Sequence, residues 1–431
     1  MDQAEDTSLE QPLRRTLVQD NNGQLTQTAF VSTNSISQGE QVGILWSELF
    51  NKFKIKIHFA HRTFKWGNEA RGNAAVHVVI IGFSNYDISE KRIFEYEKIK
   101  GEPHERIVKN INPYLAEGKD IYIDSRNKRI HSYPEMTKGS QPTDGLNLIL
   151  SEEEKLSLVS KEPESNKWIY EFIGGEELMN NKKRYCLWLK DCSLTELKLL
   201  PEVLKRVEAV REWRLTSKTK SVREFSIFPT LFTQDRQPKS SYLALPRVSS
   251  ENRKYIPIAF LSPEIIAHEK LIIIPNADVF LFGMLLSEMH MAWVKYVSGR
   301  LKSDFSYSPS VYNNYPFPTN LSEKQVQAVE AAAQNVLDAR AQFPNASLAD
   351  LYDPNTMPPV LVKAHQALDK AVDLCYRPQP FVNETKRIEF LFELYDKYTS
   401  GMFGEGKQSK SKREGVKVLL KAEGNDKPLL N

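Results

Sequence analysis

The amino-acid sequence predicts a chain in three parts: an α/β unit, an α+β domain and a C-terminal helical subdomain. Three observations predict this order. Apolar, strand-like runs flank a helical stretch between residues 27 and 83. Between residues 111 and 318, short apolar runs alternate with turns and separate helical segments. After residue 319 apolar residues recur with a helical period.

The α/β unit is predicted from three strands and one helix. Residues 28–32 (TAFVS), 54–60 (KIKIHFA) and 74–83 (AAVHVVIIGF) have the apolar or alternating patterns of strands, and residues 38–53 have a helical pattern. Residues 1–25 are polar without periodicity and are expected to form a poorly ordered tail. Residues 84–110 carry mixed charge and are predicted to be a connector.

The most informative stretch of the middle domain is residues 281–318. Its first half predicts one buried helix that ends at Gly299, because apolar residues fall near one face: Leu281, Leu285, Met289, Ala292 and Tyr296. Charged and aromatic residues then alternate, and a Pro-broken aromatic run, YNNYPFP, follows. Such a segment suits contacts with base edges. A core helix that leaves through a solvated loop explains the pattern equally well.

Two further stretches of the middle domain are basic. Residues 200–225 are helical and carry seven cations: Lys205, Arg206, Arg211, Arg214, Lys218, Lys220 and Arg223. Residues 249–254 place Ser249, Ser250, Arg253 and Lys254 in a turn between two strand-like runs. A solvated helix face and a plain β-turn are the simplest explanations of these patterns.

The C-terminal part is predicted to be helical over residues 323–343, 347–352, 357–376 and 388–399. Ser347 is a candidate N-cap, with Asp350 at the capping-box position. Residues 401–431 are basic and are expected to be a flexible tail that adds non-specific affinity for DNA.

Composition sets limits on the class of protein. The net charge of the 431 residues is only +3, so any basic surface must be local. The three cysteines show no CxxC pair, which predicts no metal site and fits a reducing cytoplasm. No apolar run approaches the roughly 20 residues of a membrane span, and the acidic N-terminus is not typical of a signal peptide.

Several segments together resemble one family. FVSTNSISQGEQVGILW, HRTFKWGNEARGNAAVHVVIIGF, SGRLKSDFSYSPSVYNNYPFP and SLADLYDPNTMPP are similar to segments of the MmeI-like adenine-specific DNA methyltransferases, many of which are fused to a restriction nuclease. The resemblance implies the C-terminal part of a methyltransferase domain over residues 26–110. It further implies a target-recognition domain over 111–318 and a helical domain over 319–400.

By this resemblance, the first part holds the last three strands of a seven-stranded Rossmann-like sheet. The complete enzyme would transfer a methyl group from S-adenosylmethionine to adenine N6. No GxG follows a predicted strand, and the INPY, NNYP and DP sequences at residues 111, 313 and 353 depart from the family's Asn-Pro-Pro-Tyr motif. We therefore assign no catalytic residue, and we expect an upstream polypeptide to supply the missing half.

The resemblance also implies a pocket for a flipped adenine. Enzymes that act on a base extrude it from the duplex and stack it on aromatic side chains. Phe83 matches the aromatic residue expected at the end of its strand, and Phe64 and Trp66 are expected to line the same cleft. A core phenylalanine at a strand end is the alternative for Phe83.

Base reading is expected from Lys302 and Asp304, where the family places base-reading residues. Two residues apart in an extended segment, they would point to the same side. A lysine suits the guanine acceptors and a carboxylate suits the cytosine amino group, so the pair predicts recognition of one G·C pair; a surface ion pair is the alternative. Contacts with the DNA backbone are expected from Arg206, Arg211, Arg214, Lys218, Arg253, Lys254 and Arg300.

Two functions therefore remain open. The chain is either the sequence-recognising part of an adenine-N6 DNA methyltransferase of a restriction-modification system, or a stand-alone DNA-binding protein without enzymatic activity. Both bind double-stranded DNA. An upstream reading frame that ends in the glycine loop and the Asn-Pro-Pro-Tyr motif would favour the methyltransferase.

Overall fold

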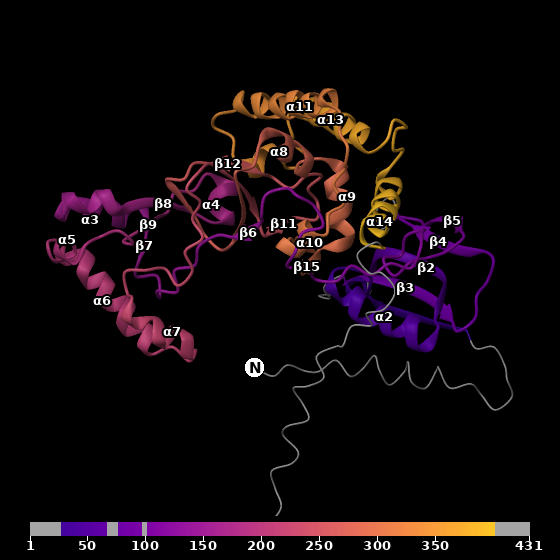
Figure 1. The fold of residues 1–431 in the computed structure, drawn as a ribbon, viewed down its shortest axis with the longest axis horizontal. Coiled ribbons are helices and arrows are strands. Elements are labelled where there is room, and N and C mark those ends of the chain that lie inside the picture. The colour runs from indigo at the N-terminus through magenta and orange to yellow at the C-terminus, as the bar shows by residue number, and fades with distance from the viewer. Residues whose placement is uncertain (1–26, 67–75, 97–100, 401–431) are drawn as a thin grey trace, which may run out of the picture.

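The computed structural model describes residues 27–66, 76–96 and 101–400 (Figure 1). The tails expected at residues 1–25 and 401–431 lie outside the described residues. At one end of the molecule, a five-stranded sheet has the strand order β1-β3-β2-β4-β5. Its strands are β1 (Thr28–Thr33), β2 (Lys56–Trp66), β3 (Val76–Ser84), β4 (Lys91–Glu95) and β5 (His104–Val108). The chain is thus of the mixed α/β kind that the sequence predicts.

Strand β3 is antiparallel to both of its neighbours, β1 and β2, so β1 and β2 run in the same direction. β4 runs parallel to β2, and β5 pairs with β4 in the antiparallel direction. The prediction of a connector over residues 84–110 is therefore wrong, because β4 and β5 extend the sheet. Charged side chains of the two strands form ion pairs with one another, such as Arg92 of β4 with Glu105 of β5 at 3.1 Å. Ile93, the residue after Arg92 on β4, is buried.

Helix α2 (Glu40–Phe53) packs its apolar face on this sheet. Val42, Trp46 and Leu49 are buried, and the Trp46 Nε1–H donates to the carbonyl of Ile36 at 2.7 Å. Ile36 belongs to the short 3-10 helix η1 (Asn34–Ser37), which follows β1 directly. The chain thus passes from the carboxyl end of β1 through η1 and a two-residue loop into α2.

The middle of the chain forms three small sheets. The first has the order β12-β10-β14-β6, with β6 (Thr137–Lys138), β10 (Tyr242–Pro246), β12 (Ala259–Leu261) and β14 (Leu271–Pro275). The second has the order β13-β8-β9-β7, with β7 (Ile149–Leu150), β8 (Ile169–Ile173), β9 (Tyr185–Leu187) and β13 (Ile265–Ala267). The third joins β11 (Val248–Ser249), β16 (Asp304–Ser306) and β15 (Gly299–Leu301).

A lobe of the middle domain lies at the opposite end of the molecule from the first sheet (Figure 1). It contains β7, β8 and β9 with the helices α3 (Glu152–Lys161), α5 (Leu194–Lys198), α6 (Pro201–Leu215) and α7 (Lys220–Glu224), and the 3-10 helices η2 (Pro163–Trp168) and η3 (Phe225–Ile227). Its core of Leu148, Phe172, Leu187 and Val203 is separate from the main core. The main core continues from the first sheet into the C-terminal helices.

The single helix predicted up to Gly299 is two helices. They are α8 (Val279–Leu285) and α9 (Glu288–Val297). The break occurs because the Ser287 hydroxyl accepts from the backbone N–H of His290 and so begins a new helix. The five residues that define the predicted helical period are all buried, as that period predicts: Leu281, Leu285, Met289, Ala292 and Tyr296.

The C-terminal helices are close to the predicted ranges: α11 (Glu323–Ala341), α12 (Leu348–Leu351), α13 (Pro359–Tyr376) and α14 (Glu384–Ser400). Ser347 and Asp350 form the predicted capping box. Figure 1 shows α11 and α13 side by side, and α14 beside the first sheet. An ion pair of 2.7 Å between Arg106 of β5 and Glu389 of α14 joins the two ends of the chain.

Candidate nucleic-acid interface

Strands β15 and β16 form a tight hairpin whose tip holds the predicted base-reading residues. Leu301 pairs with Asp304, so Lys302 and Ser303 form the turn. Lys302 has the left-handed φ of +57°. The expectation that Lys302 and Asp304 share one extended segment is therefore wrong: Lys302 lies in the turn, and Asp304 begins the returning strand.

The side chains at the hairpin tip differ in what they contact. In the described part of the chain, no hydrogen bond or ion pair engages the exposed Lys302 amino group, and none joins it to Asp304. The Asp304 carboxylate accepts from the backbone N–H of Glu251 at 3.3 Å. The local ion pair offered as an alternative is thus not formed, and the Lys302 ammonium is available to an external acceptor.

Buried aromatic side chains anchor the hairpin to the core. Phe305 and Tyr307 are buried. Burial lowers the pKa of His290 to about 4, so its ring is neutral at pH 7. Its Nδ1–H donates to the Leu285 carbonyl at 2.7 Å, and its Nε2 accepts from the Tyr307 hydroxyl at 2.8 Å. These bonds fix the start of the chain segment that leaves the hairpin.

The aromatic run that follows is core rather than a surface for bases. Tyr312, Tyr315 and Phe317 are buried. The Asn313 and Asn314 amides donate to the carbonyls of Arg126 and Asp124 at 2.9 Å each. Residues 312–318 are therefore part of the core, and neither the base-reading surface nor the solvated loop offered as its alternative describes them.

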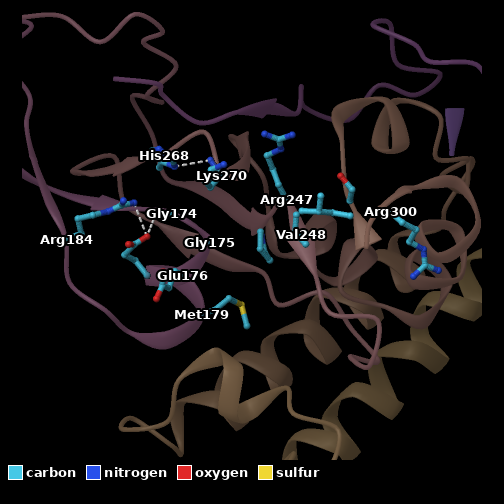
Figure 2. A pocket seen from close by; sticks show the side chains of 14 residues that line it. Gly174, Gly175, Glu176, Met179, Arg184, Arg247, Val248, His268, Lys270 and Arg300 are labelled. Atoms are coloured by element: carbon cyan, nitrogen blue, oxygen red, sulfur yellow. Dashed lines mark hydrogen bonds and ion pairs between the residues drawn. The ribbon is translucent and has the colours of Figure 1, made fainter. Parts of the chain in front are cut away.

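A pocket of about 500 Å³ lies beside the hairpin (Figure 2). Five segments line it: the start of α4 (Gly175–Asn180), the residue directly before β9, the link from β10 to β11, the turn from β13 to β14, and the hairpin. They contribute the cations Arg184, Arg247, Lys270 and Arg300. The carboxylates Glu176 and Glu177 also line the pocket, so cations outnumber anions there by four to two. Such a local excess of positive charge on a chain of net charge +3 suits nucleic acid.

Two of these cations have no partner within the described residues. Arg184 is paired with Glu177 at 3.0 Å. Among the described residues, no hydrogen bond or ion pair engages the side chains of Arg247 and Lys270, although the Lys270 backbone N–H donates to His268 at 3.2 Å. Figure 2 shows both side chains at the pocket wall. Sequence analysis missed them, because an arginine after a buried strand and a lysine in a turn carry no motif. Only the fold brings them beside the hairpin.

The turn over residues 250–254 also borders the hairpin. The Arg253 backbone N–H donates to the Ser250 carbonyl at 3.2 Å, which closes the predicted turn. Arg253 lines a second pocket of about 430 Å³ with Asn252 and Asp353, and burial lowers the pKa of Arg253. The Lys254 ammonium is paired with Glu288 at 2.5 Å. Arg253 thus faces a polar recess, whereas Lys254 already has a carboxylate partner.

The predicted backbone contacts on α6 do not form one surface. Arg214 is fully buried and donates to the carbonyls of Thr143, Phe228, Pro142 and Leu231. The expectation that it contacts phosphate is corrected by this placement, because all three guanidinium nitrogens are engaged inside the lobe. Arg206 is half-buried and paired with Glu154 at 2.8 Å. Arg211 and Lys218 are exposed and have no partner among the described residues.

Arg300 is likewise engaged inside the molecule. Its Nε–H donates to Gln38 at 3.1 Å and its Nη1–H donates to the Ser303 carbonyl at 2.7 Å. Burial lowers the pKa of Arg300 to about 10, although nearby carboxylates oppose that shift. Figure 2 shows its guanidinium directed away from Arg247. The expectation of a backbone contact is therefore corrected for Arg300 as well.

The three predicted pocket aromatics do not line one cleft. Phe83 pairs with Thr28, the first residue of β1, whereas Phe64 pairs with Val78, near the other end of β3. Five residues of strand separate these positions by roughly 16 Å. Phe83 is 5% exposed and its ring lies 5.5 Å from that of Phe30. Phe83 is thus a core residue, as its alternative proposed.

Phe64 and Trp66 lie at the carboxyl ends of the parallel strands, the edge at which α/β sheets bind their ligands. The Phe64 ring stacks on that of Tyr96 at 5.1 Å, and Trp66 is half exposed. A cavity of about 610 Å³ opens beside this edge and is lined by Thr63, Tyr96, residues of the hairpin and the start of α14. Phe64 and Trp66 are not among the residues that line this cavity, and Phe64 is connected to it through the ring of Tyr96.

Comparison with known proteins decides the family. Family models for the DNA-methyltransferase, target recognition and C-terminal domains of MmeI match residues 15–95, 117–319 and 321–403. The chain belongs to the MmeI family. It is 39% identical over 372 residues to DNA methyltransferase A of Bacillus subtilis (strain 168), covering 86% of this chain and 41% of that protein. A solved structure of the Type IIL restriction-modification enzyme MmeI in complex with DNA has a TM-score of 0.79 and 48% identity over 88% of this chain.

The chain spans about half the length of the MmeI structure that it matches, and less than half of the Bacillus relative. The recognition and C-terminal domains of the family together cover the hairpin, the pocket beside it and the helical end. The family model for the methyltransferase covers the first four strands of the first sheet.

In this MmeI-family chain, the glycine pair and the asparagine of the INPY sequence have local structural roles. The one glycine pair, Gly174-Gly175, begins α4 in the recognition domain, and the Gly174 backbone N–H donates to Glu177. The amide oxygen of Asn112 accepts from the backbone N–H groups of Tyr114 and Ala116, so this side chain stabilises the turn in which it lies. Within the described ranges there is no group of side chains arranged to hold a metal ion, and no helix long and apolar enough to cross a membrane.

Proposed function

We propose that this chain is the sequence-recognising part of an adenine-N6 DNA methyltransferase of a restriction-modification system. One observation carries the proposal: the exposed tip of the β15–β16 hairpin holds an unpaired lysine, and a pocket with unpaired cations lies beside it. The solved relative of 48% identity is a restriction-modification enzyme in complex with DNA. These features together fit a surface that reads duplex DNA.

Different side chains are proposed to contact different parts of the DNA, according to where they lie. Lys302 and Asp304 at the tip would contact the edges of one base pair, because a turn can enter a groove that a flat strand cannot. Arg247 and Lys270 are proposed to hold the DNA next to that pair, either on its phosphates or on a neighbouring base. Arg211, Lys218 and Arg253 would contact the backbone farther away.

The first sheet is proposed to be the end of a Rossmann-like methyltransferase sheet. An antiparallel strand, β3, between the parallel strands β1 and β2 supports this, since doubly wound sheets commonly carry such strands near an edge. In the described residues β1 pairs only with β3, so its other side is open to a further strand. We propose that a second part of the methyltransferase, encoded upstream, pairs there and brings the cofactor and catalytic residues.

The proposal is tested in two steps. In the first, the chain is incubated with a randomised duplex library, and the bound DNA is sequenced. Enrichment of one short motif is expected, and its absence would reject sequence recognition. In the second step, the chain is mixed with the upstream product and S-adenosylmethionine, and N6-methyladenine is mapped on that motif. Motif binding without methylation in the mixture would favour a stand-alone DNA-binding protein.

A further inference from the structure

The base of the reading hairpin is tied directly to the methyltransferase part of the chain. The Arg300 Nε–H donates to Oε1 of Gln38 at 3.1 Å. The Nη1–H of the same guanidinium donates to the Ser303 carbonyl at 2.7 Å, and the Arg300 Cζ atom lies 3.9 Å from the centroid of the Phe305 ring. One side chain therefore connects Gln38 with the turn and with the returning strand of the hairpin.

Two glycines allow the backbones to meet at the same place. Gly39, next to Gln38, has a φ of +63°. A Cβ atom added to Gly39 would lie 3.0 Å from Cα of Gly299 and 3.1 Å from its backbone N, where no side chain can give way. A glycine at position 39 thus permits both the turn into α2 and the close approach of the hairpin.

The contact between Gln38 and Arg300, which we call the joint, lies between the edge of the first sheet and the tip of the hairpin. Gln38 follows η1 at the carboxyl end of β1, the sheet edge at which such folds bind ligands. Lys302 at the reading tip is two residues from Arg300. Arg300 lines the pocket of Figure 2, the cavity at the sheet edge and a third cavity of about 350 Å³ that also includes Gly39 and Gly299.

We propose that Gln38 and Arg300 are positioning residues that hold the base-reading hairpin at a fixed distance from the methyltransferase edge. The inference rests on the proposed function, and it adds how recognition of a base pair is converted into placement of the target adenine. Neither side chain contacts the reacting atoms. A displacement of about 1 Å in a reacting geometry can lower a rate by roughly 100-fold, so a rigid joint between the two surfaces matters for turnover.

The first test uses the purified chain without DNA. Gln38→Ala removes the acceptor, whereas Gln38→Glu keeps a carboxyl oxygen for Arg300. Hydrogen exchange of residues 299–306 and 34–41 is expected to accelerate at least several-fold in Gln38→Ala and to stay near the wild-type rate in Gln38→Glu. Unchanged exchange of both segments in Gln38→Ala would overturn the joint.

The second test separates positioning from phosphate contact. Arg300→Gln is compared with Arg211→Gln, the same change on the exposed face of α6. Removal of a phosphate contact lowers the slope of log Kd against log salt by about 1. That loss is expected for Arg211→Gln and not for Arg300→Gln. A loss of about 1 for Arg300→Gln, with hairpin exchange unchanged, would overturn the positioning role.

The third test uses the chain combined with the rest of the methyltransferase. Gln38→Ala is expected to lower kcat at least tenfold while the KM for DNA changes less than twofold, and Gln38→Glu is expected to restore kcat. An equal kcat for Gln38→Ala and wild type would reject the inference. If the wild-type mixture neither binds nor methylates DNA, the proposed function itself fails, and the exchange experiment still decides whether the joint exists.

Discussion

Lys302 and Asp304, at the tip of the hairpin, differ in exposure and in hydrogen bonding. Lys302 is exposed in the left-handed turn, and Asp304 begins the next strand with one carboxylate oxygen on Glu251. A cation suits guanine N7 and O6, and a carboxylate suits the cytosine amino group. Exchange of the two charges reverses that complementarity, and an arginine at position 304 also removes the acceptor of the Glu251 N–H.

We therefore expect the double variant Lys302→Glu with Asp304→Arg to prefer the inverted base pair at one position of the site. The change in discrimination should be about 1–3 kcal/mol. N6-methyladenine is mapped genome-wide in strains that express the chain with the rest of the methyltransferase. Ser303→Ala, in the same turn, is the control and should keep the wild-type motif. An active double variant with an unaltered motif would remove both residues from base reading.

Arg214 and Arg211 are three residues apart on one helix and have opposite roles. Arg214 is buried with four carbonyl partners, whereas Arg211 is exposed. Each buried carbonyl left without a donor costs about 1–3 kcal/mol. Arg214→Met is therefore expected to lower the free energy of unfolding by roughly 3 kcal/mol or more, and Arg211→Met by less than about 0.5 kcal/mol. Urea unfolding of both variants checks this, and a stable Arg214→Met variant would contradict it.

At the scale of elements, α9 and α13 meet through one carboxylate. The Asp369 side chain of α13 accepts from the Tyr255 hydroxyl at 2.6 Å and from the backbone N–H of Glu288, the first residue of α9, at 2.7 Å. Burial, together with the neighbouring Glu288 carboxylate, raises the pKa of Asp369 to about 7. The Lys254 ammonium, paired with Glu288, partly opposes this shift.

The sign of the resulting pH dependence follows from linkage. The folded state binds the Asp369 proton more tightly than the unfolded state, whose pKa is near 3.8. The contribution of Asp369 to stability is therefore complete below about pH 4 and is lost as the pH rises to about 7. We expect Asp369→Asn to flatten the pH dependence of unfolding in this window. Asp338→Asn, an exposed position on α11, is the control and should leave it unchanged.

Strand β1 makes a second prediction at this scale. In the described residues its one partner is β3, and Val31 on it is 53% exposed. An unpaired, apolar sheet edge invites pairing with another chain. The isolated chain is expected to self-associate as its concentration rises, and Val31→Lys is expected to reduce that association. Sedimentation velocity over a range of concentrations measures both, and a monodisperse wild-type monomer throughout would contradict the open edge.

For the whole molecule, the first sheet and the lobe form opposite ends, with the β15–β16 hairpin in the three-stranded sheet between them (Figure 1). Helix α14 returns to the first sheet, where Arg106 contacts Glu95, Glu117 and Glu389. The C-terminal helices thus connect the recognition part with the methyltransferase part, in addition to the Gln38–Arg300 contact.

The whole chain is expected not to bind S-adenosylmethionine on its own. Its one glycine pair begins α4, and no glycine pair follows a strand of the first sheet. Calorimetric titration of the isolated chain should show no binding at micromolar cofactor, and the mixture with the upstream product should show it. Micromolar affinity of the isolated chain would contradict this expectation.

The sequence alone could predict what depends on neighbours along the chain. Strands β1, β2 and β3 and helix α2 follow from local patterns, and the Ser347–Asp350 cap follows from a four-residue motif. The same local patterns failed where charges are satisfied across strands, as in β4 and β5. They also failed at Ser287, whose hydroxyl caps a new helix within a continuous apolar periodicity that had predicted one helix.

The sequence by itself determined the three-part organisation, the helical periods and the family segments, because these depend on local order. Only the tertiary structure decided which side chains are available. It buried Arg214 and exposed Arg211 on one helix, and it placed Phe83 and Phe64 near opposite ends of β3. It brought Arg247 and Lys270 beside the hairpin and joined Gln38 to Arg300 across 262 residues. The physical reason is that burial and partnership depend on contacts between distant segments, which no local pattern records.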